Sequence, residues 1–210
     1  MTADATFWDK TADKYAASPV KNMHAYEQTL ARTRAQLRGT DTVLELGCGT
    51  GTTALKLAGD AGHITVTDIA PRMIAIARDK IAQQGVGNVS AQVATAHDAP
   101  VPEAGYDAVL GFNYLHLLPD MEQTIARVDA MLRPGGLFIS KTVCLGRAPH
   151  LRAAIWMLQR LGKAPYVRVL DVATLEAAMA AQGFEIIETG DYPAKPVSRF
   201  IVARKAGSRG

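Results

Sequence analysis

The 210-residue chain has few cysteines, few aromatic residues and little excess charge. Its two cysteines, Cys48 and Cys144, are too few for a disulfide framework and the wrong number for a four-ligand zinc site. The net charge of +3 permits a phosphate-bearing or membrane-surface partner without requiring one. No run of about 18 apolar residues occurs, and residues 1–10 do not resemble a signal peptide. These absences predict a cytoplasmic protein.

Short apolar runs alternate with longer helical patterns along the chain. The predicted strands are residues 42–46, 63–67, 89–93, 107–112, 137–143, 184–188 and 199–203. The predicted helices are residues 52–58, 71–84, 121–132, 149–161 and 171–182. Nearly continuous apolar strands between helices are typical of an α/β fold with a doubly wound, mostly parallel sheet. Because such folds bind ligands beyond the carboxyl ends of their strands, the loops after these strands are the candidate sites.

A glycine-rich loop follows the first predicted strand, where residues 45–51 read Glu-Leu-Gly-Cys-Gly-Thr-Gly. Glycines at alternate positions allow positive φ angles and a close approach of a ligand, and the next helix offers free N–H groups. Position 52 is threonine, so the Gly-x-Gly-x-x-Gly spacing of dinucleotide loops is absent, as is a P-loop lysine. The loop predicts a ligand site, with an unliganded strand-to-helix turn as the alternative.

An acidic residue, Asp68, stands at the end of the second predicted strand. A carboxylate at this tip can accept hydrogen bonds from both hydroxyl groups of a ribose. Taken alone, Asp68 before Pro71 can equally be a residue that starts a helix. Its pairing with the glycine loop favours the ribose interpretation.

Four segments together resemble class I S-adenosylmethionine-dependent methyltransferases. Residues 44–51 are similar to the first motif of that family, and residues 68–73 to the second. Residues 96–107 resemble the segment before the fourth strand, and residues 132–136 the turn before the fifth. The resemblance implies a Rossmann-like, seven-stranded sheet with helices on both faces and an antiparallel strand near the C-terminus. It also implies S-adenosylmethionine as cofactor, S-adenosylhomocysteine as product and methyl transfer as the activity.

The same resemblance implies roles for individual residues. The loop with Glu45 would hold the methionine part of the cofactor, and Asp68 would hold its ribose. Ile69 and Met73 would pack on the adenine, Ala96 and His97 would approach its edge, and Phe112 would lie near the sulfonium. The implied cofactor-binding residues are Tyr15, Glu45, Gly47, Cys48, Gly49, Gly51, Asp68, Ile69, Met73, Ala96, His97 and Phe112. The family often has an acidic residue where this chain has Thr95, which leaves backbone groups or Asp98 to contact the adenine.

A sulfonium methyl group is already activated, so a base is needed only when the acceptor must lose a proton. His116, just past the fourth strand, is the candidate base, and Asn113 is a candidate for orienting the acceptor. A core or helix-start role is the alternative for His116. No histidine shows metal-ligand spacing and no carboxylates cluster at the strand tips, so no metal is expected.

Two regions flank the predicted core domain, which spans residues 40–205. Residues 1–39 are predicted to form a helical cap in which Trp8, Ala12 and Tyr15 have helical spacing. This cap either covers the cofactor or docks on the sheet without touching a ligand. Residues 206–210 are predicted to be a disordered tail.

Residues 146–170 form the predicted substrate lid. Leu151, Ala154, Ile155, Leu158 and Leu161 make an apolar stripe there, beside Trp156 and four cationic residues. Such a helix lies on an anionic membrane, covers an apolar substrate or packs on the core.

These observations favour a small-molecule methyl acceptor, with a hydrophobic, lipid or quinone-type acceptor as the narrower expectation. Nucleic acid is disfavoured because the charge is modest and residues 113–116 lack the Asn/Asp-Pro-Pro-aromatic tetrad of DNA adenine methyltransferases. A catalytically silent S-adenosylmethionine-binding module is the alternative function, and a nicotinamide oxidoreductase is disfavoured by Thr52. The chain is expected to be a monomer or a homodimer.

Overall fold

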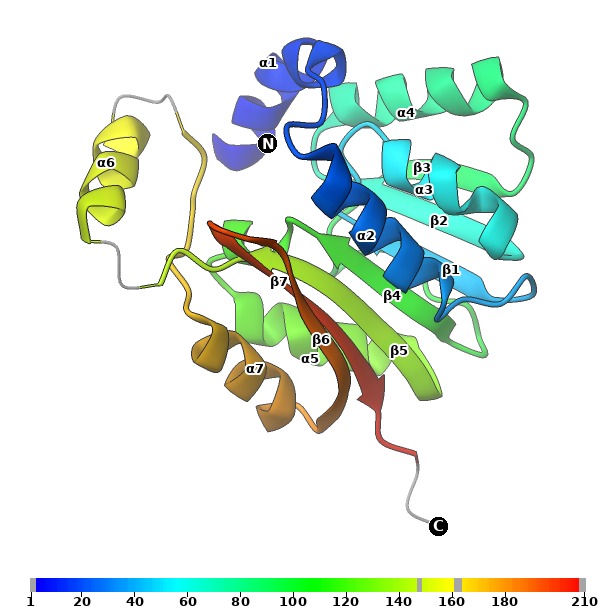
Figure 1. Ribbon diagram of the computed structural model, residues 1–210. Coiled ribbons are helices and arrows are strands. Elements are labelled where there is room, and N and C mark those ends of the chain that lie inside the picture. Colours follow the sequence, from blue (N-terminus) through cyan, green and yellow to red (C-terminus); the bar gives the residue numbers. More distant parts are fainter. Residues whose placement is uncertain (1–2, 147–148, 161–163, 208–210) are drawn as a thin grey trace.

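A seven-stranded sheet with the order β3-β2-β1-β4-β5-β7-β6 forms the centre of the computed structural model, which describes residues 3–146, 149–160 and 164–207. Only β7 runs antiparallel to its neighbours, β5 and β6 (Figure 1). This arrangement confirms the predicted doubly wound class and its antiparallel strand near the C-terminus. The strands are β1 Thr42–Leu46, β2 His63–Asp68, β3 Val89–Val93, β4 Tyr106–Phe112, β5 Leu132–Val143, β6 Phe184–Ala194 and β7 Val197–Lys205.

Helices cover both faces of the sheet (Figure 1). Apolar residues of α2, α3 and α4 pack on one face, and those of α5 and α7 on the other. The helices are α1 Ala3–Ala17, α2 Met23–Arg34, α3 Thr52–Leu57, α4 Pro71–Gln84, α5 Met121–Met131, α6 Pro149–Arg160 and α7 Val172–Ala181, with short 3₁₀ turns η1 Ala58–Asp60 and η2 Leu115–Leu117. Burial of both faces explains why the parallel strands read as continuous apolar runs.

Most predicted elements occur within a few residues of their expected ends; the exceptions are β6, which ends six residues later than predicted, and β5. This strand begins at Leu132, which pairs with Tyr106, and the next pair joins Leu137 to Ala108. Residues 133–136, predicted as a break, therefore form an irregular segment within the strand rather than the turn before it. Strands β6 and β7 are also longer than predicted, because the outer end of the edge strand β6 is largely exposed and carries no apolar run.

Helix α1 is fixed at the carboxyl end of the sheet by the first turn of α4. The Asp9 carboxylate accepts a hydrogen bond from the Arg72 backbone N–H (2.7 Å), and Arg72 pairs with Asp13 (2.6 Å). Ala12 packs with Ala70 and Met73 in a small apolar cluster. A carboxylate at a helix N-terminus is favourable because it meets unpaired N–H groups and the positive end of the dipole. These contacts hold the N-terminal helix beside the strand tips.

Helix α6 stands apart from the sheet and the helices that cover it (Figure 1). It ends at Arg160, and the predicted last apolar position, Leu161, lies outside the described residues, as do Arg147, Lys163 and the last three residues of the predicted tail. No described helix is long and apolar enough to cross a membrane.

Candidate functional site

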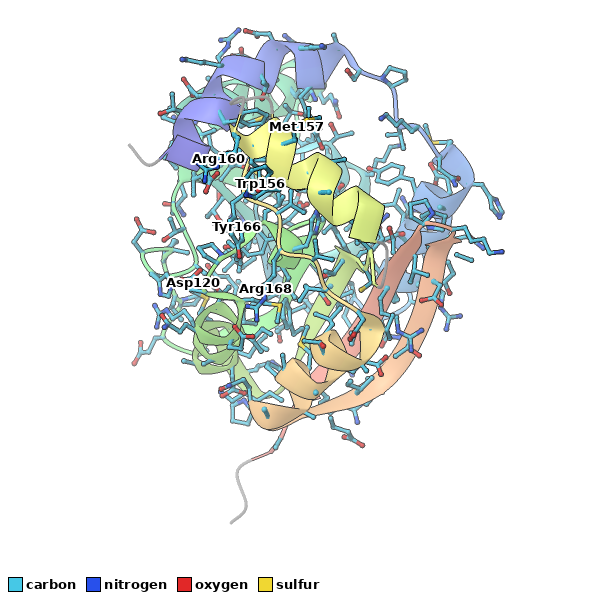
Figure 2. All side chains as sticks on the ribbon, turned by 90° about the vertical axis from the view of Figure 1, so that its left-hand side faces the viewer. Asp120, Trp156, Met157, Arg160, Tyr166 and Arg168 are labelled. Carbon is cyan, nitrogen blue, oxygen red and sulfur yellow. The ribbon has the colours of Figure 1, made fainter. Side chains whose placement is uncertain are left out.

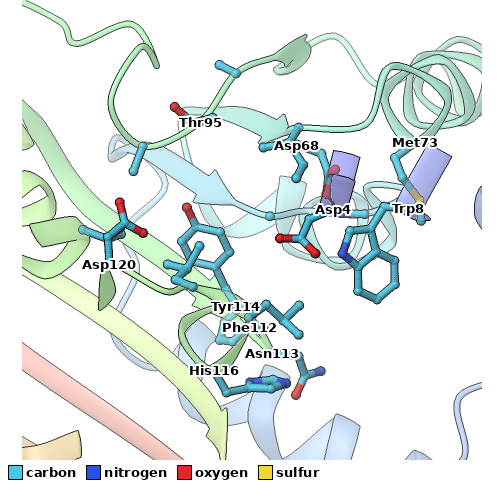
Figure 3. A pocket seen from close by; sticks show the side chains of 18 of the residues that line it. Asp4, Trp8, Asp68, Met73, Thr95, Phe112, Asn113, Tyr114, His116 and Asp120 are labelled. Carbon is cyan, nitrogen blue, oxygen red and sulfur yellow. Dashed lines mark hydrogen bonds between the residues drawn. The ribbon is translucent and has the colours of Figure 1, made fainter. Parts of the chain in front are cut away.

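A cavity of about 410 Å³ lies at the carboxyl edge of the sheet, where the sequence predicted a ligand site (Figure 3). Its size falls within the range of small-molecule sites, about 300–1,000 Å³. The residues that line it are Asp4, Trp8, Tyr15, Gly47, Gly49, Asp68, Ile69, Met73, Ala94, Thr95, Ala96, His97, Phe112, Asn113, Tyr114, His116, Leu117, Leu118, Pro119, Asp120 and Thr124. Nine of the predicted cofactor-binding residues and His116 therefore line the same cavity.

The glycine loop takes the backbone conformation that its composition predicts. Gly47, Gly49 and Gly51 have φ angles of +61°, +55° and +71°, a region that side chains disfavour. A Cβ atom on Gly47 would lie 2.5 Å from the Tyr114 ring, and one on Gly51 would lie 3.0 Å from the Ala77 Cβ atom. The loop therefore needs glycine for its own packing as well as for any ligand.

Asp68 joins the tip of β2 to the glycine loop. Its Oδ2 atom accepts a hydrogen bond from the Gly49 N–H, and its Oδ1 atom from the Ala70 N–H, both at 2.9 Å. Burial raises the pKa of this carboxyl group, while the backbone donors act in the opposite direction. A carboxylate has about four lone-pair positions, so each oxygen can still accept one more donor from the cavity side.

Tyr114 is a wall residue that the sequence analysis did not identify. Its ring lies against Gly47 and Gly111. Burial raises the pKa of its phenol far above the usual range, and a hydrogen bond with the Ala96 backbone acts weakly against this shift. A tyrosine after an apolar strand carries no sequence signal of its own, and only folding brings it against the loop after β1.

The wall after β3 contains the predicted Ala96 and His97. The His97 Nε2 atom lies 3.1 Å from the Asp120 Oδ2 atom. Asp98, a sequence candidate for the adenine contact, instead accepts hydrogen bonds from the backbone N–H and the hydroxyl group of Thr95, and it is not among the described lining residues. The acidic group on this wall is Asp120, which comes from the start of α5 and was missed because it is distant in sequence.

His116 and Asn113 border the opposite part of the cavity (Figure 3). Burial lowers the pKa of His116 to about 4, so its imidazole is neutral near pH 7, and its buried Nδ1 atom has no partner among the described residues. Asn113 has a φ angle of +54°, and its N–H donates to the Lys141 carbonyl at 2.7 Å. Asparagine adopts this left-handed conformation more readily than most residues. The unpaired buried nitrogen of His116 is therefore the feature here that points to a functional role.

Three predicted cofactor-binding residues, Glu45, Cys48 and Gly51, are not among the described residues that line the cavity. Glu45 is buried under the loop, where it interacts with the backbone of Ala54, and burial raises its pKa to about 8. Any role of these three residues in cofactor binding stays a prediction, and it would be an indirect one, exerted through the conformation of the loop.

The charge of the cavity is negative. Asp4, Asp68 and Asp120 line it, whereas no lysine or arginine occurs among its described lining residues. In the described parts of the chain, no group of three His, Cys, Asp or Glu residues is placed to hold a metal ion. Because a weakly solvated cavity strengthens electrostatic interactions, this wall favours a cationic ligand over an anionic one.

Comparisons with known proteins agree with this geometry. Residues 43–136 match the family model described as a methyltransferase domain. An uncharacterized methyltransferase of Mycobacterium tuberculosis is 32% identical over 120 residues, which is 57% of this chain and 58% of that protein. A ubiquinone/menaquinone biosynthesis C-methyltransferase of Vibrio campbellii is 32% identical over 165 residues, 68% of this chain and 64% of that protein. The chain thus spans less than two thirds of these relatives.

A solved structure shows the same fold. A putative methyltransferase of Haloferax volcanii, solved with the Trm112 methyltransferase activator, has a TM-score of 0.75 and 18% sequence identity. The similarity covers 97% of this chain and 97% of that one.

Proposed function

Because the chain belongs to the class I family of S-adenosylmethionine-dependent methyltransferases, we propose that it transfers a methyl group to a small, largely apolar acceptor. The observation that carries this proposal is the cavity itself, which is lined by the glycine loop, by His116 and by the three carboxylates Asp4, Asp68 and Asp120. When bound, S-adenosylmethionine supplies a methyl group on a positively charged sulfur with a neutral thioether as the leaving group.

The lining residues fit this cofactor in their chemistry. The free acceptor positions of Asp68 suit two ribose hydroxyl groups, and Ile69 and Met73 offer an apolar surface for an adenine. Ala96 and His97 would approach the edge of the adenine, and Phe112 would lie near the sulfonium. The net negative wall favours the cationic cofactor over its neutral product, which supports turnover by promoting product release.

The remaining residues would orient the acceptor and exclude water. Trp8 and Tyr15 bring two aromatic rings of α1 to the cavity, with their centroids 6.4 Å apart. His116 lines the cavity as a neutral imidazole, and one of its two ring nitrogens can accept a hydrogen bond from an acceptor hydroxyl or amine. If the acceptor group carries a proton, that proton would pass to water or to the free ring nitrogen of the neutral His116. Holding the acceptor in line with the methyl group can lower the activation barrier by about 7–11 kcal/mol.

The acceptor is neutral or cationic under this proposal. A phosphorylated or carboxylated acceptor would meet Asp4 and Asp120 without a described lysine or arginine in the cavity wall. Leu117, Leu118 and Pro119 supply an apolar surface beside His116. The quinone biosynthesis named for the Vibrio relative supports an apolar acceptor of this type.

Calorimetry followed by a transfer assay tests the proposal. S-adenosylhomocysteine should bind in the micromolar range and NAD should not bind. The protein is then incubated with methyl-labelled S-adenosylmethionine and matched acceptors, namely a neutral phenol or quinol, a primary amine and a phosphorylated alcohol. Transfer to the first two classes alone is the expected result. Cofactor binding without transfer to any acceptor would favour the silent binding module instead.

A further inference from the structure

Helix α6 carries a cluster of exposed apolar side chains. Trp156 is 60% exposed, Met157 54% and Leu158 38%, and Tyr166 just beyond the helix is 37% exposed. Figure 2 looks onto this helix, with Trp156, Met157 and Arg160 labelled along it. Single exposed apolar residues are ordinary on protein surfaces, but a cluster on one helix indicates an interaction surface.

The charge of this region has one sign. Residues 147–163 contain three arginines and one lysine and no aspartate or glutamate. The Arg160 guanidinium carbon lies 5.2 Å from the centre of the Trp156 ring, which is the geometry of a cation–π contact. A second copy of the chain would bring like charges together across such a face, whereas an anionic surface would complement them.

The segment that follows α6 connects this face to the cavity. The Tyr166 N–H donates to the Asp4 Oδ1 atom at 3.0 Å, and the Arg168 N–H donates to the His116 carbonyl at 2.7 Å. Both partners line the cavity. The segment that follows α6 therefore contacts two residues of the cavity, one of which is His116.

We propose that α6 docks this protein on an anionic lipid bilayer. Trp156 and Met157 enter the interface between headgroups and acyl chains, while Arg160 meets lipid phosphates. The positive charge of residues 147–163 adds attraction to the anionic surface. Tryptophan prefers this interface because its ring is apolar and its N–H is polar. Amphipathic cationic helices bind bilayers through buried apolar area together with attraction to anionic lipids. Docking is separate from methyl transfer and needs neither cofactor nor acceptor.

Co-sedimentation with vesicles, without cofactor, tests this docking. The protein should sediment at low salt with vesicles of equal parts phosphatidylcholine and phosphatidylglycerol, and much less with phosphatidylcholine alone. The double variant Trp156→Ser/Met157→Ser should lose binding. The double variant Arg152→Gln/Arg160→Gln should bind roughly thirtyfold more weakly, since each cation near an anionic surface contributes about 1 kcal/mol. Val20→Ser/Val101→Ser, which removes exposed apolar residues elsewhere, should bind as the unchanged protein does.

Tryptophan fluorescence tests which residue enters the bilayer. The chain has two tryptophans, so Trp8→Phe leaves Trp156 as the single emitter, and Trp156→Phe leaves Trp8. Brominated lipids should quench the first variant and leave the second unchanged.

Three outcomes would overturn the proposal. The first is the absence of sedimentation at low salt, and the second is equal binding of the Trp156→Ser/Met157→Ser variant. The third is a dimer that dissociates in that variant while vesicle binding is absent, which would assign the face to a second copy.

Discussion

Replacing Asp68 tests the cofactor site most directly. Asp68→Asn keeps the shape of the side chain, and Asp68→Ala removes both oxygens. In the folded protein those oxygens accept hydrogen bonds from the Gly49 and Ala70 N–H groups, so each variant changes the loop as well as the ribose position. The quantity to determine is the part of the change in binding free energy that comes from lost contacts with the ribose.

The magnitude follows from these contacts. Hydrogen bonds to a charged group contribute about 1.5–3 kcal/mol each, and a buried donor left without a partner costs about 1–3 kcal/mol. Loss of the ribose contacts from Asp68 should weaken binding of S-adenosylhomocysteine by about 1–3 kcal/mol, roughly a 5- to 150-fold change in Kd. The unpaired Gly49 and Ala70 donors should lower the free energy of unfolding of Asp68→Ala by a comparable amount. Asp68→Asn should lose less stability because its amide oxygen keeps one donor.

A double-mutant cycle separates the two contributions. Calorimetry measures binding of S-adenosylhomocysteine and of its 2′-deoxy analogue to the unchanged protein and to Asp68→Asn. Contacting groups give non-additive changes, whereas independent groups give additive ones. Asp60→Asn, which makes the same chemical change in the turn η1 where Asp60 pairs with Arg34 outside the described cavity lining, is the matched control and should leave binding unchanged.

Additive effects in this cycle would refute a direct contact between Asp68 and the ribose. Affinity of the Asp68→Asn variant equal to that of the unchanged protein would remove Asp68 from the site altogether. In either case the carboxylate would serve only to hold the glycine loop.

Three further predictions concern the loop and the acceptor side. Glu45 has an ordinary pKa of 4.5 and a folded-state pKa of about 8, so the free energy of unfolding should fall as pH rises from about 4.5 to 8. Denaturant titrations at several pH values measure this dependence, and the variant Glu45→Gln should flatten it. His116→Ala should lower kcat with little change in cofactor Kd, and the kcat profile between pH 6 and 8 should show no step from this residue, because its pKa is about 4; an unchanged kcat with the identified acceptor would make it structural. Gly47→Ala should destabilise the protein by roughly 1–3 kcal/mol in thermal melts, because the new Cβ atom meets the Tyr114 ring at a positive φ; a melting temperature equal to that of the unchanged protein would contradict this packing.

The negative cavity and the basic helix α6 divide the charges of this molecule between two tasks. The cavity carboxylates Asp4, Asp68 and Asp120 suit a cationic cofactor, and cations outside the cavity suit an anionic surface. An apolar acceptor dissolved in a bilayer would then meet helix α6 first and the cavity second. The small net charge of +3 does not reveal this division, because it sums the charged residues of the whole chain.

The parts of the fold that local sequence predicts are those with local causes. Gly47, Gly49 and Gly51 indicated a tight loop because no other residue adopts positive φ so readily. Pro71 and Gly85 marked the ends of α4, since proline suits a first helical turn and Gly85 takes the left-handed conformation at its end. The ends of β5 and β6 were less predictable, because partner strands decide how far pairing continues.

By itself, the sequence determined the order of strands and helices, the glycine loop and the acidic residue at the tip of β2, because each depends on neighbours in the chain. The tertiary structure alone decided that Tyr114 packs on Gly47, that Asp120 rather than Asp98 lines the cavity, and that Glu45 is buried beneath the loop. Contacts, burial and the resulting pKa values arise only when residues distant in sequence meet, so no local pattern encodes them.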